Sequence, residues 1–412
     1  MKKMIVKGNI HDCMTRILLL LAAVVVLAAC SENAEEPEVR VRVNVQPYTR
    51  NYTEVEQDVT TRGWVTPDGY YPYDSEEVYG KFINQINLTD KTVNIFFTRN
   101  GDDPIHGQFV HSSLDGKWYS TFEITAANYY LYGYIPSMSG VSASISSTGV
   151  PNDNTAYSEG AVLKLKGLPA VTANDLCVIV GAKNGMGYVS DEEDYVVTGL
   201  QTGRFLYAAS AASEEAHGGN YVFLLFDHLY AALRLSFKMD PKYAALRTIR
   251  VKRLELLPES NGTPINKRLN MTITLAKTDD GSSPIQSITQ EYVEGSGNPD
   301  PMFQAVKNDG DEDTPLGVPL SGDNFSDFMG SFVPVGITAF KLTTTYDVYD
   351  SQDNLIRENC RATNKLDLTT MFPADRMPFQ RGTMYAVQLT VKPTFLYVLS
   401  DPDLDNPTIE IE

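Results

Sequence analysis

The segment from Val39 to Gln46, which reads VRVRVNVQ, most constrains what this chain can fold into. Apolar and polar residues alternate along it without a break. A period of two places its valines on one side of an extended strand, so one face needs a core to pack against. The segment therefore predicts a β-strand that belongs to a sheet with a buried face.

Short runs of β-branched and aromatic residues, separated by turn residues, continue through the rest of the chain. Stretches compatible with a helix are short and occur at residues 205–216 and 323–330. This pattern predicts an all-β protein made of β-sandwiches rather than of β-α-β units. Further strands are expected at residues 92–97, 118–124, 129–136, 162–165, 175–180, 222–226, 232–238, 246–257, 269–275, 340–348 and 384–391.

The length of 412 residues predicts two domains, at roughly 100–200 residues each. We expect an N-terminal β-sandwich domain at residues 39–220 and a C-terminal one at residues 221–412. A polar, Gly- and Pro-rich stretch near 277–323 indicates a long insertion in the second domain.

Residues 1–29 have the order of charges and apolar residues that is typical of a secretory signal peptide. Basic side chains come first, and an apolar run from Ile17 to Val26 follows, too short to span a bilayer comfortably. The run ends in Leu27-Ala-Ala-Cys30, which resembles the lipobox of bacterial lipoproteins and implies a lipid on Cys30. The alternative is a secreted protein in which Cys30 is incidental. Residues 30–38 form an acidic tether, which resembles the surface-export signal of Bacteroidetes lipoproteins.

Net charge and cysteine content exclude several classes of function. The chain carries a formal charge of −18, and removal of residues 1–29, with four basic and one acidic side chain, leaves −21. Such acidity argues against nucleic acid as a partner. Beyond Cys30 only Cys177 and Cys360 remain, and a long-range disulfide or two buried free thiols are both open.

We find no motif that predicts catalysis, a metal site or a cofactor. His106 and His111 would share a metal only if a turn lay between them, so a surface pair without a ligand is expected. The acidic clusters at 308–313 and 401–406 lack the order of a calcium-binding EF-hand loop and are expected to be solvated. The tyrosine-rich run at 129–134 could be a sugar-stacking platform, although a buried sandwich face is the stronger expectation.

Taken in order, several segments resemble the fimbrillin-like proteins of Bacteroidetes, which build type V pili and related adhesins. The resemblance rests on the lipobox, the alternating first strand, Thr61-Arg-Gly63, YGYIP at 132–136, ALRLSFK at 232–238 with 249–256, and RGTMYAV at 381–387. It implies two transthyretin-like β-sandwiches in a surface protein that is not an enzyme. Its implied partners are other pilin-like subunits, a host or bacterial receptor, and the outer membrane through the lipid, with a place at the cell surface or in a fimbria.

The resemblance also implies an assembly mechanism. An arginine- or lysine-directed protease would cut after the first strand, at Arg62 or at Arg50. Release of that strand, with its apolar set Val39, Val41, Val43 and Val45, would open a groove that a strand of another subunit fills. The alternative is that the first strand stays in place permanently, as in an anchor or a lone adhesin.

One departure from the family concerns the C-terminus, where a polymerising subunit needs a donor strand. The tail after Val398 is acidic and interrupted by Pro402 and Pro407, which leaves only residues 408–412. This favours a tip, accessory or adhesion role over a shaft subunit. Two other classes stay open, namely a surface glycan-binding lipoprotein of a nutrient-uptake system and a secreted hydrolase with facing carboxylates.

Overall fold

The computed structural model describes residues 40–41, 43–49, 53–56, 92–111, 118–148, 156–170, 172, 174–186, 202–210, 220–265, 268–280, 282–293, 303–304 and 317–391. Cys30, Val39, Arg50, Arg62 and both acidic clusters lie outside these residues. The described part consists of strands joined by turns and loops, and its α-helix α4 (Pro241–Ala244) has 4 residues. No helix within it is long and apolar enough to cross a membrane.

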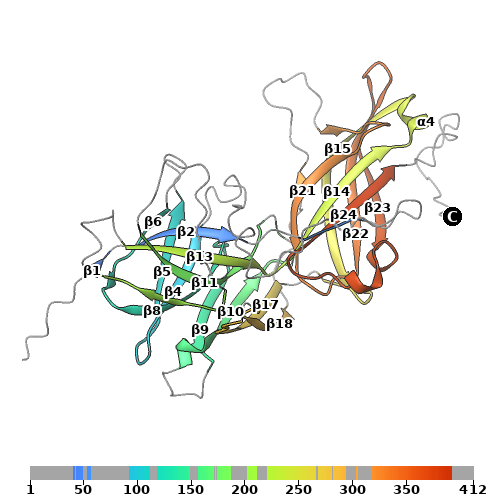
Figure 1. Ribbon diagram of the computed structural model, residues 1–412. Helices are drawn as coiled ribbons and strands as arrows, with labels where there is room; N and C mark the ends of the chain where they lie inside the picture. Colours follow the sequence, from blue (N-terminus) through green and yellow to red (C-terminus); the bar gives the residue numbers. More distant parts are fainter. Residues whose placement is uncertain are drawn as a thin grey trace, which may run out of the picture.

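A first β-sandwich is formed by an eight-stranded and a four-stranded sheet (Figure 1). The larger sheet has the order β2 (Val43–Thr49), β13 (Asn220–His228), β11 (Cys177–Met186), β8 (Asn128–Ile135), β4 (Thr92–Thr98), β5 (Ile105–His111) and β6 (Trp118–Ser120), with β12 (Leu206–Ala208) paired to β8. The smaller sheet has the order β18 (Ile285–Val293), β17 (Arg268–Ala276), β10 (Gly160–Leu168) and β9 (Ser142–Ser147). A separate pair joins β1 (Arg40–Val41) to β7 (Ile124–Thr125).

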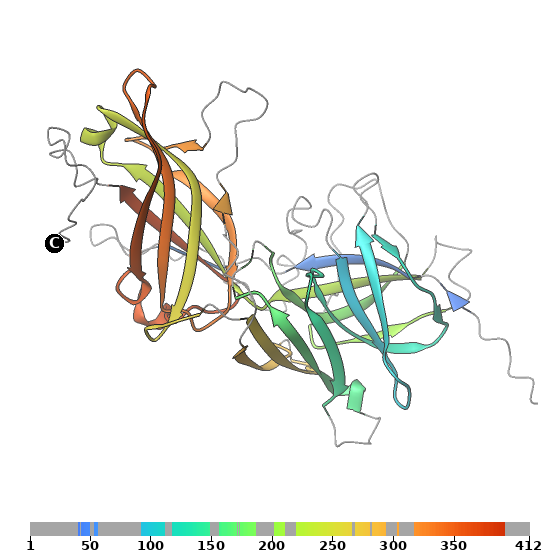
Figure 2. The same ribbon diagram turned by 180° about the vertical axis from the view of Figure 1, so that it is seen from behind.

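A second β-sandwich stands beside the first, as both views of the molecule show (Figures 1 and 2). One sheet has the order β21 (Ser326–Val333), β14 (Ala231–Met239), β24 (Thr383–Val391) and β3 (Thr53–Glu56). The other has the order β16 (Thr263–Pro264), β15 (Arg247–Ser260), β22 (Ala339–Asp350) and β23 (Leu355–Asp367), with β19 (Phe303–Gln304) and β20 (Val318–Pro319) paired to β15. Short 3-10 turns η2 (Ala156–Ser158), η3 (Leu368–Thr370) and η4 (Ala374–Arg376) complete the described elements.

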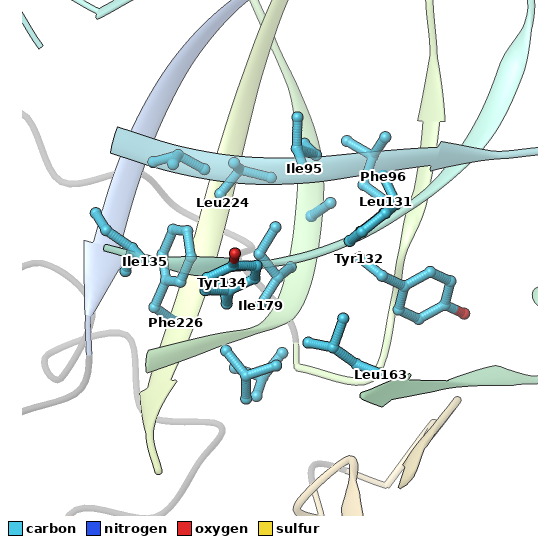
Figure 3. Packing of buried hydrophobic residues seen from close by; sticks show 14 of the residues in the cluster. Ile95, Phe96, Leu131, Tyr132, Tyr134, Ile135, Leu163, Ile179, Leu224 and Phe226 are labelled. Atoms are coloured by element: carbon cyan, nitrogen blue, oxygen red, sulfur yellow. The ribbon is translucent and has the colours of Figure 1, made fainter. Parts of the chain in front are cut away.

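The predicted all-β class with two β-sandwiches is confirmed, and each sandwich has its own core. In the first, Ile95, Leu131, Ile179 and Leu224 of the larger sheet and Leu163 of the smaller one belong to one cluster of buried side chains, part of which Figure 3 shows. In the second, Leu235, Leu254, Phe340 and Tyr385 are members of a separate cluster of buried side chains. β17 buries alternate residues, whereas β4 is buried along nearly its whole length and so has both faces covered.

The division between the two cores does not coincide with the predicted boundary at residue 220. β13 completes the first sandwich up to His228, and the chain then enters the second through β14. It returns at β17 and β18, inside the region expected to belong to the second domain. Leu269, Met271, Ile273 and Leu275 alternate along β17 and are buried in the first core, opposite the larger sheet. The expected insertion near 277–323 therefore contains β18, a strand of the first sandwich.

Two further expectations are corrected. The stretch at 205–216 contains the strand β12, and the stretch at 323–330 contains the start of β21. Both strands take up the free hydrogen-bonding edge of a neighbouring strand, β8 and β14 respectively. Pairing with a sheet therefore outweighs the local helix compatibility of these stretches.

Exchange of Ile273 for alanine tests the interleaved chain path. Ile273→Ala should lower the free energy of unfolding of the first sandwich by about 2–5 kcal/mol, because it leaves a cavity in that core. Trp118 is buried in the same core, so its fluorescence in a Trp64→Phe background reports this transition. Leu256→Ala, in the second core, is the matched control. This chain path would be refuted if Leu256→Ala lowered the stability that Trp118 fluorescence reports and Ile273→Ala left it unchanged.

Candidate functional site

The first strand lies at the edge of the larger sheet of the first sandwich. β2 pairs in parallel with β13, with Val43 opposite Asn220, Val45 opposite Val222 and Thr49 opposite Phe226. Figure 1 shows the two strands side by side. β2 is the end of this sheet, so β13 is its one neighbour in the strand order. Hydrogen bonds therefore hold β2 along one side, in a parallel ladder that is slightly weaker per residue than an antiparallel one.

Two valines of β2 point into the core. Val43 and Val45 are both 0% exposed and belong to the buried cluster of the first sandwich. β6, which the strand order places at the opposite end of the same sheet, comes close to β2. β2 therefore covers the core between β13 and β6. The structure brings together two of the four predicted valines; the side chain of Val41 and the whole of Val39 lie outside the description.

The N-terminal segment also pairs with the second sandwich. After β2, the chain forms β3, which runs parallel to β24 with Thr53 opposite Thr383 and Glu56 opposite Ala386. β3 is the edge of its sheet, just as β2 is the edge of its own. We call β1, β2 and β3 together the N-terminal strap. Sequence reasoning missed β3, because a four-residue strand carries little periodicity.

The candidate cleavage sites flank β3 in the sequence. Arg50 directly follows the last residue of β2, and Arg62 follows β3 by six residues. Both arginines lie outside the described residues. Their positions in the sequence nevertheless distinguish them. A cut after Arg50 separates β1 and β2 from β3, whereas a cut after Arg62 separates the whole strap from the remaining chain.

A partly buried ion pair connects the two sandwiches beside the strap's partner strands. Arg381, just before β24, donates to the carboxylate of Asp227 in β13 over 2.8 Å. It also donates to the carbonyl oxygen of His228 and to the hydroxyl of Ser283, both in first-sandwich segments. Close by, the amide of Gly382 donates to the carbonyl of Tyr230. The start of β24 is thus fixed to the end of β13, which sets the two strap-binding edges relative to each other.

The other predicted features are dispersed. His106 stacks on Phe96, and His111 meets Trp118 edge-on, so the two histidines do not form a joint site. The tyrosine-rich run is mainly core, as expected: Tyr129, Tyr132 and Tyr134 are buried and Tyr130 is half-buried. The run therefore does not present the three-tyrosine platform that a sugar would stack on.

Neither remaining cysteine forms a disulfide, which leaves two free thiols. Cys360 is half-buried and Cys177 is buried; burial, together with the nearby carboxylate of Asp175, raises the pKa of the Cys177 thiol well above its ordinary value. A thiol that stays protonated is a poor nucleophile.

A hollow between β18 and residues 378–381 is lined by apolar and polar side chains with Arg381, and none of the described lining residues is a carboxylate. It does not supply the paired carboxylates that the hydrolase hypothesis needs.

Comparisons with known proteins point to surface proteins of Bacteroidetes at low similarity. A candidate cell adhesion protein from Bacteroides uniformis is 11% identical with a TM-score of 0.32, over 85% of this chain and 93% of that protein. A fimbrial protein from Bacteroides ovatus is 9% identical with a TM-score of 0.27, over 86% of this chain and 50% of that protein. A candidate cell adhesion protein from Parabacteroides distasonis is 10% identical with a TM-score of 0.27, over 86% and 93%.

These structural neighbours are candidate cell adhesion proteins and a fimbrial protein. No protein-family model matches the chain, and the comparison with curated proteins finds no match.

Exchange of Val45 for alanine measures how much β2 contributes to the first core. Val45→Ala should lower the free energy of unfolding by about 1–3 kcal/mol, through lost burial and the cavity left behind. Val110→Ala, at a 41% exposed position of the same sandwich, is the matched control and should stay within about 0.5 kcal/mol. Urea titrations give both values. Equal effects of the two changes would mean that β2 is not part of the core.

Loss of the Arg381 side chain should destabilise the junction between the sandwiches. Arg381→Ala leaves the carboxylate of Asp227, which is 1% exposed, without its cation, at a cost of about 3 kcal/mol. Arg376→Ala removes an exposed ion pair with Asp375 and should cost at most about 1 kcal/mol. Thermal unfolding of both variants checks the difference. An Arg381→Ala protein as stable as the Arg376→Ala protein would contradict the assignment.

Proposed function

We propose that this chain is a non-enzymatic, lipid-anchored surface protein of a fimbrillin-like adhesin or pilus, in which proteolysis removes the N-terminal strap and a strand of another subunit replaces it. The observation that supports this most directly is the complete burial of Val43 and Val45 in a strand at a sheet edge. After a cut in the chain that follows it, such a strand would be held in the core by non-covalent contacts alone, so another strand could replace it.

The physical basis is β-augmentation. Removal of β2 leaves the hydrogen-bonding edge of β13 unpaired and two valine-sized pockets open, so an incoming strand gains main-chain hydrogen bonds and apolar burial together. Burial of two valines contributes about 3 kcal/mol. An exposed edge of this kind is prone to pair with another chain, which is the property that an assembling subunit requires.

Arg62 is the more productive of the two candidate cleavage sites. A cut after Arg50 would leave β3 attached to the remaining chain and able to stay paired with β24. A cut after Arg62 would free β1, β2 and β3 as one segment, so that both sandwiches would offer an open edge. An incoming strand could then span both, with β13 and β24 as its partners.

Within such an assembly the chain would be a structural, tip or accessory subunit that accepts a strand of a neighbour. The lipid on Cys30 would hold the protein at the outer membrane during export, and the adhesive partner would be a host or bacterial surface receptor.

Limited proteolysis of the full-length chain tests this proposal. Trace trypsin should produce one preferred cut after Arg62, identified by intact mass, and the cut protein should bind a synthetic peptide of residues 40–56. A peptide with Val43→Asp and Val45→Asp is the matched control, because a carboxylate cannot enter the apolar pockets. Arg62→Ala should prevent the productive cut, and Arg50→Ala should leave it unchanged.

The possible results separate the alternatives. Peptide binding without self-association supports the tip or accessory role, and ladder-forming oligomers would assign the chain to the shaft instead. A chain that resists trypsin before residue 92, or a cut chain that ignores the peptide, would mean that the first strand is permanent and would overturn strand exchange.

A further inference from the structure

Three side chains with metal-ligating atoms meet at one end of the first sandwich. Cys177 is the first residue of β11 and His228 is the last of β13, and the two lie directly opposite each other in the antiparallel register. Asp175 lies two residues before Cys177, on the segment that enters β11. Because the three positions come from one loop and two paired strands, the sheet itself fixes their separation.

The ligand atoms form a compact triangle. Sγ of Cys177 lies 3.3 Å from Nδ1 of His228 and 3.4 Å from Oδ1 of Asp175. Nδ1 of His228 lies 3.0 Å from Oδ2 of Asp175. Within the described part of the chain, this is the group of three metal-ligating side chains whose ligand atoms are close enough to bind one ion.

These distances are close to those of a tetrahedral zinc site. With Zn–S near 2.3 Å and Zn–N or Zn–O near 2.0 Å, tetrahedral angles place a sulfur about 3.5 Å from a nitrogen or oxygen ligand, and nitrogen about 3.3 Å from oxygen. Each edge of the triangle therefore needs to widen by only a few tenths of an ångström. Thiolate and imidazole are also ligands that zinc prefers.

Burial and charge favour a divalent ion at this place. Cys177 and His228 are buried, whereas the side chain of Asp175 is 22% exposed and gives the cluster its contact with solvent. One thiolate and one carboxylate carry two negative charges, which a Zn²⁺ ion neutralises in a place where a net charge would be costly. An ion would reach the cluster from solvent at this carboxylate, and a water would complete its four ligands.

The arrangement does not fit nucleophilic catalysis. In a cysteine–histidine–acid triad, the two ring nitrogens serve different partners, one facing the nucleophile and the other the acid. Here the same Nδ1 atom of His228 faces both Cys177 and Asp175. Convergence of three ligand atoms on a common centre is what a metal site requires.

We propose that Asp175, Cys177 and His228 bind one Zn²⁺ ion. On binding, the Cys177 thiol gives its proton to solvent, and the imidazole of His228 ligates through a deprotonated Nδ1 with its proton on Nε2. A coordinated thiol loses its proton because of the charge of the ion itself. The ion would link β11 to β13, next to Asp227 and its ion pair with Arg381. This site is independent of strand exchange.

Cobalt and zinc titrations of the reduced full-length chain test the site. Co²⁺ should bind with a 1:1 stoichiometry and produce the near-ultraviolet thiolate charge-transfer band and the intense visible bands of a tetrahedral complex, and Zn²⁺ should displace it. Cys177→Ala should abolish the charge-transfer band and weaken Zn²⁺ binding at least about 100-fold, since even outer-shell partners contribute about 10–100-fold. Cys360→Ala, which removes the other described cysteine, is the matched control and should change neither.

Asp175→Asn provides a second variant that keeps the size of the side chain and should weaken Zn²⁺ binding at least about tenfold. Excess Zn²⁺ should raise the unfolding temperature of the unmodified chain and of Cys360→Ala, but not of Cys177→Ala, because only a bound ion stabilises the folded state. Absence of the charge-transfer band in the unmodified chain, its persistence in Cys177→Ala, or its loss in Cys360→Ala would overturn the proposal. In that case the cluster is a hydrogen-bonded group in which one carboxylate accepts from the thiol and the imidazole.

Discussion

Two parallel edge pairings, β2 on β13 and β3 on β24, are the interactions on which the arrangement of this molecule depends. They join the first strands of the chain to one edge in each sandwich, and in the first sandwich they bring Val43 and Val45 into the core. A sheet edge needs a partner or a cover, since unpaired amide and carbonyl groups attract other strands. The strap supplies that cover from within the chain, and any assembly that exchanges strands has to compete with it.

The interleaved chain path makes the two sandwiches dependent on each other. β17 and β18 complete the first sandwich, although the segments before and after them build the second. The connection from β13 to β14, the Asp227–Arg381 pair and the bridge between Thr172 and Phe332 add further links at the junction. If the chain were divided at residue 220, β17 would be on the C-terminal piece, and the N-terminal piece would lack this strand of the first sandwich. The strap is therefore one of several segments that cross between the sandwiches.

The fold class was predictable from alternation and from short runs of β-branched and aromatic residues, and the strands β23 and β9 were missed for a common physical reason. β4, β8, β13 and β24 are strands that the sequence predicts, because each has apolar side chains that pack inward. β23 escapes detection because it is an edge strand with both faces largely exposed, so its residues need no alternation. β9 is likewise an edge strand, and its serine-rich sequence carries almost no hydrophobic signal. The chain path is also hidden, because nothing local says which sheet β17 joins.

The candidate site likewise has a part that the sequence predicts and a part that it does not. The valines of the first strand are legible in the sequence because their own periodicity predicts burial, and Val43 and Val45 are buried as expected. Their partner strand cannot be predicted from the sequence, because β13 lies far along the chain and only the order of strands in the sheet brings it next to β2. The cluster of Asp175, Cys177 and His228 depends on the same long-range register, in which a one-residue slip of β13 would turn His228 to the other face of the sheet. Spacing in the sequence therefore identifies a strand that needs a core, whereas sites that two strands build together become visible only once their pairing is known.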